Sequence, residues 1–220
     1  MKFNKDMLLL YAVTDRGKAD RRTFYEQVRK ALSGGVTIVQ LREKNLNDDE
    51  FLTEASELRE LCHSYGVPLI INDNVDVALK SGADGVHVGL DDMPVSKIRM
   101  TAGASFIIGA TAKTVEQARL AQNSGADYLG VGAVFPSPTK KDAVRITNEQ
   151  LRKIAHSVNI PIVAIGGINL DNALEIKNSG VSGIAVVSAI FSAGNITNAA
   201  EQLKEKAKTV VFGQSAYTKI

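Results

Sequence analysis

The feature of the sequence that most restricts its fold is a short pattern that occurs three times. The stretches "SGADGVHVG" (81–89), "SGADYLGVG" (124–132) and "SGVSGIAVV" (179–187) each place a glycine shortly before a run of apolar residues. A glycine in this position is typical of a helix that ends and turns into a buried strand. Each stretch therefore predicts the junction between a helix and a strand in a repeating unit.

Short apolar runs of strand length recur along the whole chain, and segments with helical spacing lie between them. The runs are "LLLYAVTD", "VTIVQLRE", "PLIIND", "GVHVG", "FIIGAT", "YLGVGAVF", "PIVAIGG" and "GIAVVSAI". Eight strands that alternate with helices predict an α/β fold, a single (β/α)₈ TIM barrel, and 220 residues are enough for it. A doubly wound open sheet is the alternative, but the G-x-G-x-x-G fingerprint does not follow the first strand.

Composition and charge exclude several classes of protein. The hydrophobic content of 45% is enough for a large core. The net charge of +2 arises from 26 basic and 24 acidic residues spread along the chain, so no basic stripe is available for nucleic acid. The single cysteine, Cys62, excludes an intramolecular disulfide and indicates a reducing compartment.

The N-terminal segment is not expected to be a signal peptide. The apolar run "MLLLYAV" follows Lys2 and Lys5 but is too short for a signal peptide and lacks a cleavage site. No apolar stretch reaches membrane-spanning length. We therefore expect a cytoplasmic protein with one domain over residues 1–220, in which residues 209–220 form a loose C-terminal tail.

Two carboxylates follow neighbouring strands at the edge where a barrel carries its chemistry. Asp73 comes directly after "LIIN", and Asp92 follows the next strand. Together they predict a Mg²⁺ site, because Mg²⁺ takes few protein oxygens and completes its shell with water and substrate phosphate. The alternative for either residue is that it caps the helix that follows.

Cations at the same edge predict an anionic ligand. Arg42, Lys44 and Lys140 together would suit a diphosphate bridged by Mg²⁺, whereas Lys141 is expected to be a solvated surface charge. A second anion site is suggested by "AIGGI" and "VVSAI", since the loops after strands 7 and 8 of a barrel often hold a phosphate. A tight turn explains the glycines of "AIGGI" equally well.

Taken in order, the motifs "VTIVQLREK", "INDNVDVAL", "GVHVG" followed by Asp92, "FPSPTKKDA", "AIGGI" and "VVSAI" resemble the thiamine phosphate synthase family. The resemblance covers most of the chain. It implies a Mg²⁺-dependent enzyme that joins 4-amino-2-methyl-5-hydroxymethylpyrimidine diphosphate to 4-methyl-5-(2-phosphoethyl)thiazole and releases diphosphate. It also implies two small-molecule substrates and neither nucleic acid nor a membrane as a partner. It does not decide whether the protein forms a homo-oligomer.

The family pattern assigns roles to individual positions. It makes Asp73 and Asp92 the magnesium ligands and Arg42, Lys44, Thr111 and Lys140 the catalytic residues. The substrate-binding positions are Gln40, Leu41, Arg42, Glu43, Lys44, Asn72, Thr111, Ser137, Pro138, Thr139, Lys140, Gly167, Val187 and Ser188. The chain departs from the pattern at Leu90, Thr111 and Lys113, where the family usually has Gln, Ser and His.

Three other functions stay open. A thiazole tautomerase of the same superfamily would share the phosphate site but would not need the Asn72, Asp73 and Asp92 set. A barrel that binds a phosphorylated metabolite without turnover is the second. A sugar-phosphate isomerase is the third, although it would need a general base that the sequence does not single out. His87, inside a predicted strand, has no assigned role.

Overall fold

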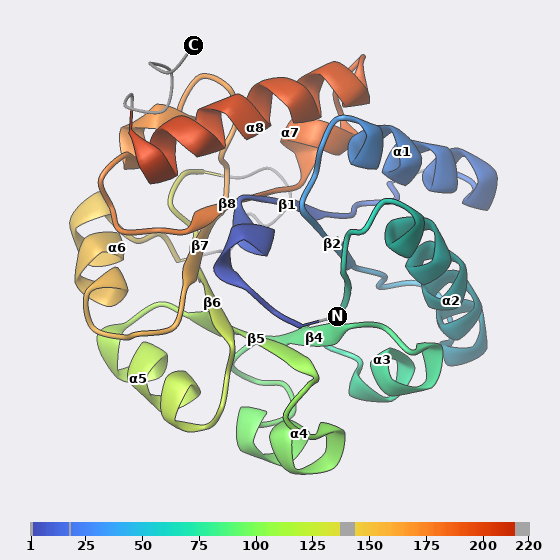
Figure 1. The fold of residues 1–220 in the computed structure, drawn as a ribbon, viewed down its shortest axis with the longest axis horizontal. Coiled ribbons are helices and arrows are strands. Elements are labelled where there is room, and N and C mark those ends of the chain that lie inside the picture. Colours follow the sequence, from blue (N-terminus) through green and yellow to red (C-terminus); the bar gives the residue numbers. More distant parts are fainter. Residues whose placement is uncertain (1, 18, 137–143, 214–220) are drawn as a thin grey trace.

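The protein is a closed barrel of eight parallel strands, in the order β1 to β8 (Figure 1). A computed structural model describes residues 2–17, 19–136 and 144–213. The strands are β1 (Leu10–Val13), β2 (Ile38–Leu41), β3 (Leu69–Asn72), β4 (Gly85–Val88), β5 (Ile107–Ala112), β6 (Tyr128–Gly132), β7 (Ile162–Ile165) and β8 (Gly183–Val186). The predicted (β/α)₈ fold is confirmed.

Helices surround the barrel and connect its strands (Figure 1). The helices are α1 (Arg21–Ser33), α2 (Asp48–Ser64), α3 (Val75–Ser81), α4 (Val95–Ala102), α5 (Val115–Asn123), α6 (Asn148–Ala155), α7 (Ser188–Phe191) and α8 (Ile196–Phe212). Most begin at a side chain that accepts a backbone N–H of the first turn, such as Asp20 before α1 and Asn47 before α2. Each such cap stabilises its helix by about 1 kcal/mol.

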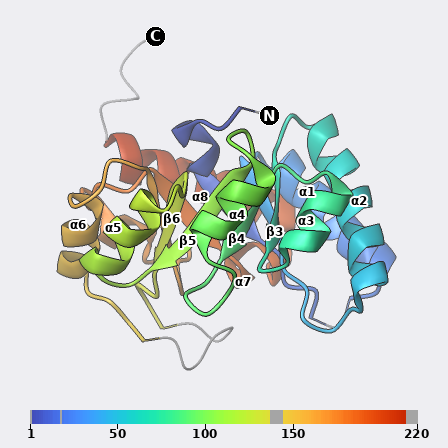
Figure 2. The ribbon, with the colours of Figure 1, turned by 90° about the horizontal axis from the view of Figure 1, so that it is seen from below.

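Three short helices interrupt the regular alternation of strands and longer helices. The 3₁₀ helix η1 (Lys5–Leu8) precedes β1, so the first apolar run is not a strand throughout. It lies over one end of the barrel, as Figure 2 shows from the side. A second 3₁₀ helix, η2 (Ala173–Ile176), stands between β7 and β8. The predicted strand "GIAVVSAI" ends at Val186, and its last residues begin α7.

The C-terminal helix extends further than the sequence suggested. α8 continues through Phe212, so residues 209–212, which were expected in a loose tail, are helical. Val210 explains the extension, because its side chain is buried against the core. Residues 214–220 lie outside the described residues.

The core has two layers, one on each side of the sheet. Inside the barrel, Ile38, Ile70, Ile107 and Val163 pack around the rings of two tyrosines. Between the sheet and the helices lies a larger apolar cluster. Burying each large aliphatic side chain contributes about 1.5–3 kcal/mol, so both layers hold the strands in place.

Strand register brings the predicted site residues to one end of the barrel. Val13 pairs with Gln40, Asn72 pairs with His87, and Thr111 pairs with Gly130. Since alternate residues of a strand face the same side, these polar side chains are placed on the inner face of the barrel near the ends of their strands. The fold thereby gathers them around one opening.

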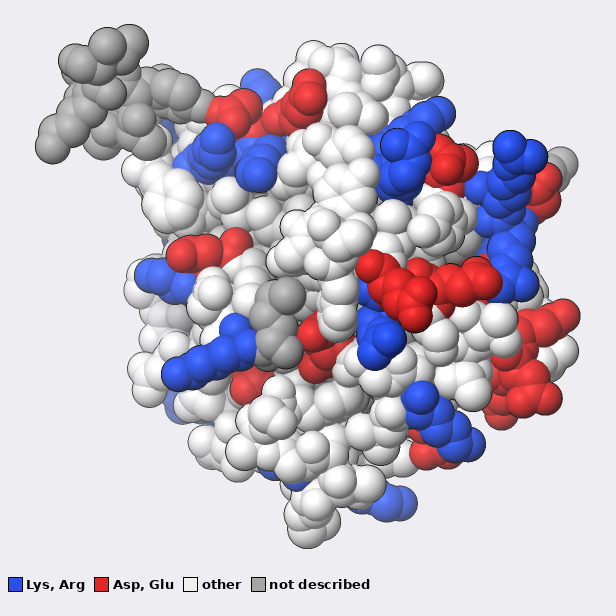
Figure 3. All heavy atoms as spheres, turned by 45° about the vertical axis from the view of Figure 1, so that its right-hand side comes forward, with Lys and Arg blue, Asp and Glu red and all other residues white. Residues whose placement is uncertain are grey.

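The outer surface carries mixed charge. On the face drawn in Figure 3, groups of basic and acidic side chains are interspersed. Within the described ranges, no helix is long and apolar enough to cross a membrane.

Candidate active site

A cavity opens at the C-terminal end of the barrel. Every strand contributes to its wall, and the loops after β2, β5, β7 and β8 add to it. Its lining includes Tyr11, Gln40, Arg42, Asn72, His87, Thr111, Lys113, Gly130, Val163, Gly167, Ala185, Val187 and Ser188. Seven of the positions that the sequence predicted for the site therefore border one space: Gln40, Arg42, Asn72, Thr111, Gly167, Val187 and Ser188.

The end of β2 is clamped to the end of β1. The Arg42 backbone N–H donates to Thr14 Oγ1 at 3.0 Å, and the Thr14 N–H donates to the Gln40 carbonyl at 2.9 Å. Gln40 and Arg42 line the cavity. Leu41, between them, is fully buried in the layer between the sheet and the helices, so its side chain faces away from the cavity.

Asp73 follows β3 in an unusual backbone conformation. Its φ is 61°, in the left-handed region that aspartate tolerates better than most residues. The helix that follows is capped by Asn74, whose side chain accepts the Val77 N–H at 2.9 Å. Asp73 is therefore not the helix cap, and its carboxylate is available for another contact: Lys44 Nζ donates to its Oδ2 at 2.8 Å.

Asp92 lies beside Asp73. Its Oδ2 accepts the Gly89 N–H at 2.7 Å, while the following helix α4 begins at Pro94 without a side-chain cap. Burial and the neighbouring Asp73 carboxylate raise the pKa of Asp92. Burial also disfavours the charged form of Asp73. The hydrogen bond that Lys44 donates to Asp73, together with other contacts, nevertheless lowers the pKa of Asp73. The two carboxyl groups thus interact directly.

The carboxylate pair suits a small divalent cation. Two carboxylates that repel each other gain from a shared positive charge, and Mg²⁺ is commonly held by one or two carboxylates plus substrate oxygens. Among the residues that the structure describes, no cluster of three or more His, Cys, Asp or Glu side chains could hold a metal alone. An ion at Asp73 and Asp92 would need oxygens from water or a ligand.

A chain of hydrogen bonds runs beneath the cavity through five strands. Gln40 Nε2 donates to Tyr11 Oη at 2.8 Å, and Tyr11 Oη lies 2.8 Å from Tyr128 Oη. His87 continues the chain, with Nδ1 at 3.2 Å from Tyr128 Oη and Nε2 at 3.1 Å from Thr111 Oγ1. Two predicted ligand-binding residues, Gln40 and Thr111, therefore stand at its ends.

Glycines make room for this chain. A Cβ atom at Gly109 would lie 2.3 Å from Tyr128 Oη and 2.5 Å from His87 Nδ1. A Cβ atom at Gly130 would lie 2.9 Å from His87 Cε1. Gly109 is on β5 and Gly130 is on β6. Because neither residue carries a side chain, the rings of His87 and Tyr128 fill the space that side chains at these two positions would otherwise occupy.

Desolvation keeps the aromatic groups of the chain uncharged. Burial lowers the pKa of His87 to about 4, and the nearby Asp73 carboxylate only partly opposes this. Burial also raises the pKa of both Tyr11 and Tyr128, so their hydroxyl groups stay protonated. The floor of the cavity is polar but electrically neutral at physiological pH.

Tyr11 and Tyr128 were not among the residues predicted for the site. A signal was present, because a tyrosine inside a strand that is buried on both faces needs a hydrogen-bond partner for its hydroxyl group. Lys113, noted above as a departure from the family pattern, borders the cavity, whereas Leu90 is exposed.

The opposite side of the cavity is built from backbone. Gly166 and Gly167 follow β7 with φ values of 103° and 66°. A Cβ atom at Gly167 would lie 2.2 Å from the Pro136 carbonyl oxygen, so close packing by itself is enough to require glycine at this position. Val187 and Ser188 follow β8, and Ser188 begins α7. Ser137, Pro138, Thr139, Lys140 and Lys141 lie outside the described residues.

These features define a class of protein. It is a (β/α)₈ barrel with its polar cavity at the C-terminal ends of the strands; an acidic pair and Lys44 follow β2 to β4, Arg42 lines the cavity, and two glycines follow β7 on the opposite side. That arrangement suits phosphorylated ligands.

Comparison with known proteins gives the family within this class. The thiamine monophosphate synthase family matches residues 10–190. Thiamine-phosphate synthase of Ruminiclostridium cellulolyticum is 49% identical over 196 residues, which cover 89% of this chain and 93% of that protein. Thiamine-phosphate synthase of Alkaliphilus oremlandii is 46% identical over 209 residues, which cover 94% of this chain and all of that protein.

A solved structure agrees with the sequence relatives. Thiamine phosphate pyrophosphorylase from Pyrococcus furiosus superposes with a TM-score of 0.87 at 44% identity, over 94% of this chain and 98% of that one. The chain belongs to the thiamine monophosphate synthase family, as its motifs predicted.

Proposed function

We propose that this barrel joins 4-amino-2-methyl-5-hydroxymethylpyrimidine diphosphate to 4-methyl-5-(2-phosphoethyl)thiazole, giving thiamine phosphate and diphosphate, with Mg²⁺ as cofactor. Membership of the family supports this transferase reaction. The observation that carries the proposal is the carboxylate pair of Asp73 and Asp92 with Lys44, which follow β2 to β4 at the end of the barrel where Arg42 lines the cavity.

Asp73 and Asp92 would hold the Mg²⁺ ion. When bound, the ion supplies positive charge that stabilises the leaving diphosphate. Lys44 already contacts Asp73, and it would share this task with Arg42 and Lys140. These cations need no proton transfer, because they act directly on the charge that develops as the bond breaks.

The reaction begins with cleavage of the C–O bond at the pyrimidine methylene group. The electron pair leaves with the diphosphate, and the positive charge left behind is delocalised toward the 4-amino group of the pyrimidine. The thiazole nitrogen then forms the new C–N bond. Gln40 and Asn72 would orient the pyrimidine, with Thr111 near the reacting group, and a neutral His87 would not repel the cation.

The thiazole phosphate would occupy the glycine-rich side. Gly167, Val187 and Ser188 border the cavity there and would hold its phosphate group, together with Ser137–Thr139. Two anion sites on opposite sides of one cavity bring the two substrates together. A cavity that excludes water would then protect the cation from hydrolysis.

Incubation of the purified protein with both substrates and Mg²⁺ tests the proposal. We expect diphosphate release and thiamine phosphate formation in equal amounts, with neither product when the thiazole phosphate is omitted. Diphosphate release without the thiazole phosphate would contradict the coupled reaction. Absence of turnover with all components present would leave a binding protein or a tautomerase, and isomerisation of a thiazole substrate alone would identify the latter.

A further inference from the structure

An ion cluster behind the β2–α2 turn contains Glu43, which was expected to bind substrate but does not border the cavity. Arg16, in the loop after β1, donates from Nε to Glu43 Oε1 at 3.0 Å. Its Nη2 atom donates to Glu54 Oε2 on α2. The guanidinium carbon also stands 4.5 Å above the ring of Phe24 on α1. One arginine therefore connects two βα loops and two helices.

Both carboxylates of this cluster are withdrawn from water. The Glu43 and Glu54 side chains are only 4% and 5% exposed. Taking two charges out of water is costly, and Arg16 compensates only one of them. Burial and the neighbouring Glu54 carboxylate accordingly raise the pKa of Glu43. Burial would lower the pKa of Arg16, but Glu54 and Glu43 raise it above its ordinary value, so the guanidinium stays charged.

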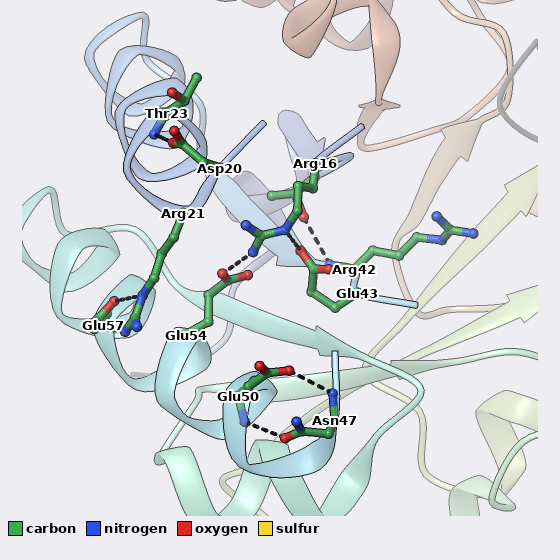
Figure 4. Close-up of polar contacts among 11 residues, drawn as sticks. Arg16, Asp20, Arg21, Thr23, Arg42, Glu43, Asn47, Glu50, Glu54 and Glu57 are labelled. Atoms are coloured by element: carbon green, nitrogen blue, oxygen red, sulfur yellow. Dashed lines mark hydrogen bonds and ion pairs between the residues drawn. The ribbon is translucent and has the colours of Figure 1, made fainter. Parts of the chain in front are cut away.

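The position of Glu43 gives the cluster its significance. In the sequence, Glu43 stands between Arg42, which lines the cavity, and Lys44, which contacts Asp73. Its own side chain turns to the other side and contacts Arg16 (Figure 4). Figure 4 also shows that the Arg42 side chain extends away from the cluster. Consecutive side chains of an extended chain point to opposite sides, so holding Glu43 behind the turn directs Arg42 forward. Lys44 stands at the bend that follows and reaches Asp73.

We propose that Arg16, Glu43 and Glu54 are positioning residues, which fix the β2–α2 turn so that Arg42 and Lys44 reach the diphosphate of the pyrimidine substrate. This inference rests on the function proposed above. The hydrogen bond from the Arg42 N–H to Thr14 fixes the start of the turn, and Asn47, which caps α2 and accepts the Glu50 N–H at 3.0 Å, fixes its end. The Arg16 cluster holds the part between them.

Glu43→Ala tests the proposal, because it removes the contact with Arg16 and leaves Arg42 and Lys44 in place. A small displacement of a charged group can reduce catalysis by up to about 10²-fold, so we expect a 10- to 100-fold loss of kcat/KM for the pyrimidine diphosphate. Binding of inorganic diphosphate, measured by calorimetry with Mg²⁺, should weaken in parallel. The KM for the thiazole phosphate should stay within about twofold, because its site is on the other side of the barrel.

The chain offers a matched control on the same two helices. Arg21 on α1 donates from Nε to Glu57 Oε2 on α2 at 3.1 Å, but this pair is exposed and does not contact the β2–α2 turn (Figure 4). Glu57→Ala removes the same charge from an arginine–glutamate pair, and it should leave turnover and diphosphate binding unchanged. Glu43→Gln keeps an oxygen for the Arg16 Nε–H and should restore most of the lost activity.

The outcomes separate positioning from a general effect on folding. Equal loss for both substrates in Glu43→Ala, or wild-type diphosphate binding by that variant, would overturn the proposal. If Glu43→Ala does not fold, Arg16→Lys replaces it, since one ammonium group cannot reproduce the two-armed contact and should weaken diphosphate binding selectively. Diphosphate binding is measured without turnover, so an inactive wild-type protein would contradict the proposed reaction and still leave this inference testable.

Discussion

The two sides of the cavity are built by different means. At the ends of β2 to β4, the cavity is bordered by side chains that carry charge or hydrogen bonds, with Lys44 contacting Asp73 at 2.8 Å. At the end of β7, the chain offers two glycines with positive φ, of which Gly167 fits against the carbonyl oxygen of Pro136, and Val187 and Ser188 follow β8 beside them. A substitution on the first side removes a single functional group from the cavity wall. A substitution on the second side alters the wall only by displacing the backbone.

This difference matches the chemistry proposed for each side. A leaving diphosphate develops negative charge during the reaction, so it calls for preorganised cations and a metal ion that act in the transition state. A phosphate that only anchors a substrate keeps its charge throughout, and fixed N–H groups are sufficient to bind it. Substitutions on the first side should therefore affect kcat, and those on the second side should affect KM.

The largest effect is expected at the carboxylate pair. Asp73→Asn or Asp92→Asn removes one anionic ligand, and at limiting Mg²⁺ it should reduce kcat on the order of 10²- to 10³-fold. Initial rates measured against Mg²⁺ concentration should show a raised metal requirement. Asp91→Asn is the control, because Asp91 is an exposed neighbour in the same turn. Wild-type turnover by both variants at limiting Mg²⁺ would contradict the two-carboxylate site.

A smaller loss is expected at Lys140. Lys140→Ala should slow the chemical step by on the order of 10²-fold, as loss of one preorganised electrostatic group typically does. Single-turnover rates at saturating substrates measure this step, and the KM for the thiazole phosphate should change little. Lys141→Ala, the adjacent cation, should retain the wild-type rate. If the two variants behave alike, the charge that acts on the diphosphate is not that of Lys140.

On the backbone side, Gly167→Ala should act on stability and on one substrate. Its φ of 66° makes a side chain strained, and the Cβ atom would displace the segment around Pro136. We expect the KM for the thiazole phosphate to rise about tenfold, as for the loss of one hydrogen bond to a charged group. The pyrimidine diphosphate should bind normally.

Gly66→Ala provides the control for strain alone. Gly66 has a similar φ of 69°, and a Cβ atom there would meet nothing within 4 Å, so alanine should cost only about 1–2 kcal/mol of unfolding free energy. Urea unfolding of both variants separates strain from collision. If Gly167→Ala is no less stable than Gly66→Ala, its added carbon atom is accommodated and Gly167 is not needed for packing. Equal weakening of both substrates would count against two distinct anion sites.

Local patterns in the sequence predicted the fold and much of the cavity wall. The apolar runs, the glycine before three of them and the helical spacing between them are properties of short segments, so they indicate the eight units directly. The rule that barrels carry polar groups at strand ends then placed Gln40, Asn72 and Thr111 at the cavity. None of these inferences required knowledge of which distant side chains touch.

What the sequence did not predict depends on contacts between distant residues. Tyr11 and Tyr128 meet across 117 positions of the chain, and no local pattern records such a pair. Arg16 likewise finds Glu43 and Glu54 only after β1 and β2 have paired. The short helix η2 stands where a full helix is usual in this fold, and the direction of the Glu43 side chain away from the cavity also required the folded chain.

The smallest effect is expected at His87, and it concerns stability alone. Burial lowers the pKa of this histidine to about 4, below its ordinary value of 6.5. Between these two values the unfolded chain binds a proton that the folded protein does not, so the unfolding free energy should fall as the pH is lowered from 6.5 toward 4. Among the described residues that border the cavity on the glycine-rich side there is no histidine, so the dependence is expected from the side-chain-built side.

His87→Asn should flatten this dependence, although the variant itself will be less stable at neutral pH because the hydrogen bonds to Tyr128 and Thr111 change. Urea unfolding between about pH 4.5 and pH 7.5, without Mg²⁺, measures the slope, whose contribution from one histidine is at most about 1.4 kcal/mol per pH unit. His156→Asn is the control: His156 is exposed at the end of α6, outside the barrel, so charging it does not place a charge in the cavity floor. A slope in His87→Asn equal to that of the wild type would show that the buried histidine is not the group that titrates.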